Sequence, residues 1–304
     1  MSEESFEQSR ASNLEKLTRH INQLPMLPGV LFQLMKLNSD DNEFYDQVHE
    51  LAKSDPPLAS FILGYANSAA SSPNHKINSL QAALTRVGSQ TIVELITALS
   101  VSKVFIPSQP EHKAIWKHSI ETAVIASFLS KNTHHHEVDP EMAYMCGLLH
   151  DIGRFVLFQF APEALNETDI MGWSSPDELP LVEEKILGTS HTEIGFIACQ
   201  KLNLPPVVAS VVKHHHNYNI FRNTQAPKVF RELVLIIQFA DFLSVMAIKT
   251  PGWAQLSTDD LKTHILAHCI MPNWGQHALP LDMIAKALPM LITKSDKLAA
   301  SLGV

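Results

Sequence analysis

Histidine and aspartate residues occupy positions on apolar helical stripes where a hydrophobic residue is expected. His118 continues the stripe that contains Ile115, and Asp241 lies on the stripe that contains Ile237 and Val245. A carboxylate on a buried helix face costs free energy unless a cation or several donors meet it. Neutral imidazoles and carboxylates are natural ligands of divalent metals, so this pattern indicates a metal site.

Two further pairs of candidates lie where helices are predicted to end. His150 and Asp151 close the predicted helix of residues 142–149. His215 and His216 end a helix whose apolar residues include Val208, Val211 and Val212, and a polar helix end would explain them almost as well.

The remaining candidate, His191, lies in the first turn of a helix that Ser190 opens, and Glu193 would complete a capping box there. Taken singly, each candidate has a simpler explanation, such as a core histidine with one hydrogen bond or a buried aspartate paired with a cation. Five separate helices that each present such a residue match the way a helical bundle builds a metal site. The candidate ligands are His118, His150, Asp151, His191, His215, His216 and Asp241.

The elements that must position these residues are predicted to be helices. Asp55 and Pro56 begin one helix, Ser79 caps another that ends at Gly88, and a third starts at Ser89. Sustained two-residue alternation is missing from the sequence, so strands are not required. We therefore predict an all-α fold, a multi-helix bundle with an N-terminal helical subdomain.

Composition restricts the compartment and the partners. The 304 residues carry a net charge of −8 and contain 16 His but only 11 Gly; few glycines favour helices, and the charge argues against nucleic acid. The 3 cysteines form no paired motif, which is typical of a reducing cytosol. The polar start is no signal peptide, and the apolar stretch of residues 233–248 is too short to span a bilayer. A cytoplasmic protein without a membrane partner is expected.

Breaks in the helical pattern divide the chain. Amphipathic helices are predicted over residues 27–37 and 281–291, a polar linker over 107–112, a surface loop over 168–180, and a solvated connector at His134–His136. The predicted segments are an N-terminal tail (1–19), a helical subdomain (20–106), a helical bundle with the candidate metal site (113–250) and a C-terminal helical extension (251–304).

The order His118, His150-Asp151-Ile152-Gly153, Asp241 resembles the signature of the HD metal-dependent phosphohydrolase superfamily. The chain resembles more specifically the HDOD family, the HD-related output domains of bacterial signalling proteins, over roughly residues 20–250. The segments that carry this resemblance are Leu24-Pro25-Met26-Leu27-Pro28, Ser54-Asp55-Pro56-Pro57-Leu58-Ala59, Ala66-Asn67-Ser68-Ala69, Ser79-Leu80-Gln81-Ala82-Ala83, Gly147–Arg154, and Leu204-Pro205-Pro206 with His215-His216.

The resemblance implies a centre of one or two divalent ions such as iron or manganese. Asp151 would bridge them, with His118, His150 and Asp241 on one side and His191, His215 and His216 on the other. Arg154 stands where a lysine is common in the family and could pair with a phosphate. The more distant HD-GYP phosphodiesterases have a GYP motif after the paired histidines, and this chain has Asn217-Tyr218-Asn219 instead.

Two functions fit these features. We favour a regulatory HDOD protein of bacterial signal transduction that retains a metal-binding HD site and acts through a signalling partner. The alternative is an active metal-dependent phosphohydrolase or phosphodiesterase, which would take a nucleotide or another phosphate-containing small molecule as substrate.

Overall fold

The computed structural model describes residues 3–25, 29–34, 37, 43–53, 55–68, 77–106, 109–133, 137–269 and 280–304. These residues form helices and connecting turns, with no strand among them, so the predicted all-α fold is confirmed. The connector His134–His136 lies outside the described residues, as do parts of the predicted helix 27–37 and of the linker 107–112. In the described part of the chain, no helix is both long enough and apolar enough to cross a membrane.

The chain divides into two compact units. One comprises residues 1–24 and 107–296, and the other comprises residues 25–106 and 297–304. The units are defined by contacts in space, whereas the four segments proposed above follow chain order, so that segmentation stays a prediction.

The smaller unit is built from short amphipathic helices. Asp55 caps α4 by accepting a hydrogen bond from the Leu58 amide, and Ser79 caps α5 in the same way through Ala82. Both predicted caps are confirmed, and Gly88, with φ 83°, ends α5 as predicted. The helices are α2 (Gly29–Leu34), α3 (Phe44–Lys53), α4 (Pro56–Ala66), α5 (Leu80–Val87) and α6 (Ser89–Ser102).

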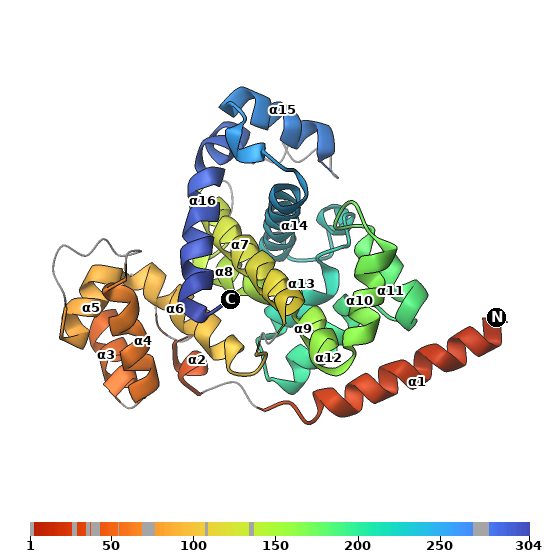
Figure 1. Ribbon diagram of the computed structural model, residues 1–304, viewed down its shortest axis with the longest axis horizontal. Coiled ribbons are helices and arrows are strands. Elements are labelled where there is room, and N and C mark those ends of the chain that lie inside the picture. The colour runs from red at the N-terminus through yellow and green to blue at the C-terminus, as the bar shows by residue number, and fades with distance from the viewer. Residues whose placement is uncertain are drawn as a thin grey trace. The chain divides into compact units, whose positions relative to one another are not determined.

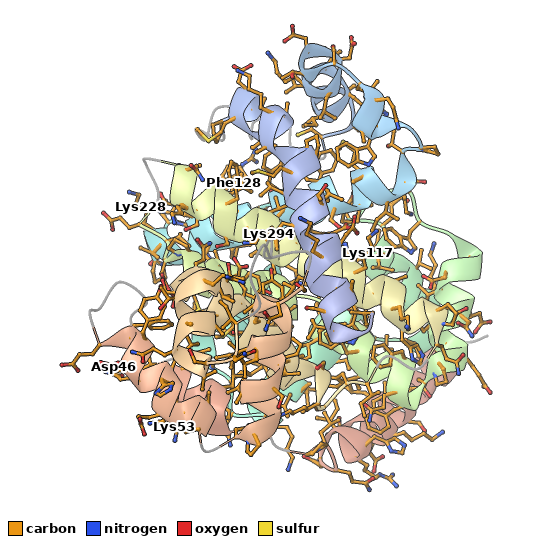
Figure 2. All side chains as sticks on the ribbon, turned by 60° about the vertical axis from the view of Figure 1, so that its left-hand side comes forward. Asp46, Lys53, Lys117, Phe128, Lys228 and Lys294 are labelled. Carbon is orange, nitrogen blue, oxygen red and sulfur yellow. The ribbon has the colours of Figure 1, made fainter. Side chains whose placement is uncertain are left out.

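The core of this unit lies on the inner faces of these helices. Phe44 and Val48 of α3 are buried beside other apolar residues of the unit, while Asp46 and Lys53 of the same helix are exposed. Figure 2 labels both charged side chains, which project outward from α3. The alternation of buried and exposed residues follows the helical period.

The larger unit contains the helices that carry the candidate ligands. Its long helices α7 and α14 pack against each other, and both contact α8, so the three lie side by side (Figure 1). Its helices are α1 (Glu3–Ile21), α7 (Pro110–Asn132), α8 (Pro140–Leu149), α9 (Ile152–Phe160), α10 (Pro162–Met171), α11 (Leu179–Leu187), α12 (His191–Lys201), α13 (Pro206–His214), α14 (Lys228–Lys249) and α15 (Thr258–His268). Two 3₁₀ turns, Ile220–Arg222 and Trp253–Gln255, and most of α16 (Leu281–Leu302) complete it.

Two predicted loops are shorter than the sequence suggested. Pro110 begins α7, so the linker expected over residues 107–112 gives way to helix there, because proline suits the first helical turn. The loop expected over residues 168–180 reduces to residues 172–178, since α10 continues to Met171 and α11 begins at Leu179. In both cases the polar composition belonged to a helix end.

Candidate metal centre

The seven candidate ligands come together inside the larger unit. His118 lies on α7, Asp241 on α14, and His191 in the first turn of α12, while the two pairs lie immediately after α8 and α13. They form two groups in which the ligand atoms lie within 4.8 Å of one another. One group is Asp151, His191, His215 and His216, and the other is His118, His150 and Asp241.

The Asp151 carboxylate lies between the two groups. Its Oδ1 is 3.2 Å from His191 Nε2 and 3.7 Å from His150 Nε2. Its Oδ2 is 3.8 Å from His118 Nε2. A carboxylate whose oxygens lie near histidines of both groups is placed where a bridging ligand would be needed.

Backbone carbonyls fix the protonation of two histidines. His150 Nδ1 lies 2.7 Å from Gly147 O, and His215 Nδ1 lies 2.8 Å from Val212 O. Because a carbonyl oxygen only accepts, each Nδ1 must carry the hydrogen, and in the neutral ring each Nε2 then has a free lone pair. Both Nε2 atoms face into the cluster.

Buried carboxylates orient two more histidines. Glu183, fully buried on α11, accepts hydrogen bonds from His191 Nδ1 at 2.6 Å and from the His191 amide at 2.7 Å. On the other side, Ser244 donates to Glu121 at 2.6 Å, so its oxygen accepts from His118 Nδ1 at 2.9 Å. Such outer partners fix the tautomer and ring orientation of metal-binding histidines.

Sequence reasoning missed Glu183 and Glu121, although the signal was present. Glu183 lies four residues after Leu179 and four before Leu187, both of which are buried, so it is a carboxylate on an apolar stripe. Glu121 follows His118 by three residues on the buried face of α7. The criterion that selected Asp241 would have selected both residues.

The capping box predicted at the start of α12 is wrong in its serine half. Ser190 makes no side-chain cap to the helix; its hydroxyl pairs with the Thr192 hydroxyl at 2.8 Å, and the His191 amide is taken by Glu183. Glu193 accepts from the Thr189 hydroxyl at 2.8 Å. The buried first turn of α12 is therefore held by Glu183 of α11, through the His191 amide, and not by a Ser190 cap.

Gly153 and Gly195 allow α9 and α12 to approach closely. A Cβ atom on Gly153 would lie 1.9 Å from the carbonyl oxygen of His191, and one on Gly195 would lie 3.0 Å from the Gly153 amide nitrogen. Only glycine fits at such a contact between backbones. The glycine that follows His150-Asp151 thus sets the position of His191.

Burial controls the charge of several cluster residues. Burial lowers the pKa of His150 to about 4, and burial lowers the pKa of His216 well below its usual value. Burial would raise the pKa of Asp151, but His150 and His191 outweigh it and hold that pKa well below its ordinary value. Neutral imidazoles at His150 and His216 and an ionised Asp151 are therefore favoured, and these are the forms that bind metal ions. Burial would also lower the pKa of His118 and of His191, but Asp241 and Glu183, respectively, outweigh it and raise both pKa values.

The donor set fits divalent metal ions. His118 Nε2 and His150 Nε2 lie 3.2 Å apart, and His191 Nε2 lies 3.3 Å from His215 Nε2 and 3.1 Å from His216 Nε2. Nδ1 carries the hydrogen in His118, His150, His191 and His215, so in the neutral rings the Nε2 lone pairs of His118 and His150 face each other, as do those of His191 and His215, without a hydrogen between them. The buried Asp241 Oδ2 also has no hydrogen-bond partner among the described residues. A bound cation would remove the repulsion between the facing lone pairs and would give the Asp241 oxygen a partner.

Arg154, the predicted phosphate contact, lies one helical turn beyond Asp151. Its guanidinium is 3.0 Å from Asp169 Oδ1, and its side chain is almost fully buried. Arg154 also borders a cavity whose wall includes His118, Asp151 and His216. The structure therefore brings Arg154 next to the cluster, and its role towards a phosphate stays a prediction.

Solved structures share this architecture. A candidate phosphohydrolase from Shewanella amazonensis SB2B is 21% identical, covers 94% of this chain and 98% of its own, and superposes with a TM-score of 0.67. An HDOD domain protein of unknown function from Geobacter sulfurreducens is 20% identical, with coverages of 95% and 98% and a TM-score of 0.66. A candidate signal transduction protein from Marinobacter aquaeolei VT8 is 17% identical, with coverages of 98% and 66% and a TM-score of 0.71.

A sequence relative is an uncharacterized protein from Treponema pallidum (strain Nichols), which is 27% identical over 223 residues. The match covers 73% of this chain but only 42% of that relative's length. The family model of the HDOD domain matches residues 24–218, which include every candidate ligand except Asp241. Because that match spans more than half of the sequence, the chain belongs to the HDOD family.

Proposed function

We propose that this protein is a bacterial signal-transduction module that holds two divalent metal ions in its HD site and regulates a partner protein. The observation that carries the metal assignment is the pair of adjacent ligand groups, with the carboxylate of Asp151 close to histidines of both. The regulatory assignment is supported by the HDOD match and by likeness to a candidate signal transduction protein. A separate helical unit before the ligand-bearing helices offers surface for a partner.

In this proposal His118, His150 and Asp241 would hold one ion, and His191, His215 and His216 would hold the other. Asp151 would contribute its carboxylate to both sites. A divalent ion supplies Lewis acidity towards phosphoryl oxygens and water. Glu183 and the Ser244–Glu121 pair keep Nδ1 of His191 and His118 protonated, so that each Nε2 is presented to an ion.

Metal analysis of protein purified without a histidine tag tests the assignment. After reconstitution with iron(II) or manganese(II), the wild-type protein is expected to retain two ions per chain, and Asp151→Ala is expected to lose at least one. Asp46→Ala, which removes an exposed carboxylate on α3, is the matched control and should retain both. Wild-type protein that retains no metal would contradict the proposal.

A metal-dependent phosphohydrolase is the second candidate, favoured by the cavity that borders the cluster. His118, Asp151, His216 and Asp241 all line this cavity, so a ligand inside it would reach the proposed ions. Arg154 on the same wall is placed to pair with a phosphate. Hydrolysis of p-nitrophenyl phosphate by the metal-loaded protein, and its loss in Asp151→Ala, would establish this function. A protein that binds two ions but hydrolyses no member of a panel of phosphate esters would instead support the regulatory function.

A further inference from the structure

The cavity beside the cluster has two chemically different ends. Its inner end is formed by the candidate ligands His118, Asp151, His216 and Asp241. The rest of its lining includes apolar side chains from α7, α14, the connection between α10 and α11, and the first residue of α11. The apolar lining that matters here is Ile115, Val245, Ile248, Trp173 and Leu179.

Cations lie where these two parts meet. Arg154 is only 5% exposed, and its Nε has no hydrogen-bond partner among the described residues, although Asp169 pairs with its terminal nitrogen. Lys249, near the end of α14, also lines the cavity, and its ammonium donates to the Trp173 carbonyl. An anion at this point would meet one buried and one exposed cation.

The charge of the lining suits an anionic ligand once the site is loaded. Four carboxylates face two cations around the cavity, so two divalent ions would leave the lining with two net positive charges. A phosphate ester with two negative charges would balance them. The charged lining residues are Glu111, Asp151, Asp169, Asp241, Arg154 and Lys249.

Trp173 presents a planar apolar surface to the same space. Its half-buried ring lies 3.4 Å from Lys249 Nζ and 5.8 Å from Arg154 Cζ, measured to the ring centroid. Cations over an indole face are attracted by its quadrupole, which holds both of them beside the ring. The residue is therefore positioned to contact the body of a ligand whose anionic end is bound by Arg154 and the cluster.

The cavity volume limits the ligand. It is about 220 Å³, below the roughly 300–1,000 Å³ of typical drug-sized ligand sites. A small phosphate ester fits this volume.

We propose that this cavity binds a small phosphate monoester with a planar or apolar body, and that Trp173 selects for that body. The inference rests on the proposed metal site, because the phosphate end requires the loaded cluster. Arg154 and Lys249 position the anionic end, while Ile115, Val245 and Ile248 enclose the body.

Two phosphonates that cannot be hydrolysed test this inference by calorimetry on manganese-loaded protein. Phenylphosphonate is expected to bind about tenfold more tightly than methylphosphonate, because its ring is buried against Trp173. Trp173→Ala should remove most of this preference with little change in methylphosphonate binding, and Trp173→Phe should retain it. Lys249→Met should weaken both ligands by a similar factor, and Trp253→Ala, outside the cavity, should change neither.

Metal content measured on the same samples separates the two proposals. Two bound ions without a preference for phenylphosphonate, or with a preference that survives in folded Trp173→Ala, would overturn the ligand inference and leave the metal site standing. A wild-type protein that binds no metal would overturn the metal site and the ligand inference together.

Discussion

Replacing Glu183 by glutamine tests whether an outer carboxylate controls the metal centre. Glu183 is fully buried, and its Oε2 accepts both hydrogen bonds from His191, from Nδ1 at 2.6 Å and from the amide at 2.7 Å. Glutamine keeps the size of the side chain but removes the charge. Its NH₂ group also takes the place of one carboxylate oxygen, and an NH₂ group cannot accept a hydrogen bond.

The expected effect is larger on metal binding than on folding. Loss of an outer partner of a metal-binding histidine typically weakens metal affinity about 10- to 100-fold, which corresponds to about 1.4–2.7 kcal/mol. At a fixed metal concentration well above Kd, the stabilisation that metal adds to the folded protein should fall by the same amount. In metal-free protein, glutamine also removes the cost of burying the Glu183 charge. The free energy of unfolding should therefore fall by less in metal-free protein than in metal-bound protein.

Competition with a chromogenic chelator measures the metal affinity. Urea unfolding with and without metal measures how much bound metal adds to the free energy of unfolding. Glu184→Gln is the matched control, because Glu184 is the next residue of α11 and its side chain is exposed. It should bind metal as the wild-type protein does. If Glu183→Gln also bound metal with wild-type affinity, the reasoning that Glu183 presents His191 to an ion would be refuted.

Three other perturbations have definite expected outcomes. Gly153→Ala should lower the free energy of unfolding, measured by urea titration, by about 1–3 kcal/mol, because the new Cβ would lie 1.9 Å from His191 O. Gly64→Ala is the control, since a Cβ there meets open space, and it should not lower the free energy of unfolding. Removing metal with a chelator should lower the stability of wild-type protein by about 2.7 kcal/mol per site if free metal had stood at 100 times Kd, and the loss should be smaller in Asp151→Ala. Gln238→Met should raise the thermal midpoint of unfolding, since neither amide atom of the buried Gln238 has a hydrogen-bond partner among the described residues. Removing an unpaired buried amide relieves a desolvation cost of about 1–3 kcal/mol. An unchanged or lower midpoint would show that the amide is hydrogen-bonded.

The helices of this protein were predictable because their signals are local. Asp55 and Ser79 cap their helices through the amide three residues ahead, and Gly88 ends one by adopting a positive φ that other residues avoid. Errors arose where polar composition was taken for a loop. Asp169 lies inside α10, where it pairs with Arg154, a contact between two helices that the sequence does not display.

The candidate ligands could be predicted individually because each one interrupts an apolar stripe or lies at the end or the start of a predicted helix, whereas their grouping depends on contacts between helices. Within four residues of Asp151 the only other candidate ligand is its neighbour His150, yet the Asp151 oxygens lie near histidines of both groups. That position follows from the close crossing of α9 and α12, which Gly153 permits. Glu183, on the preceding helix α11, contacts His191 at the start of α12. A sequence pattern can therefore nominate ligands, but the protonation of each ring is set by partners on other helices, and those partners decide which nitrogen is presented to an ion.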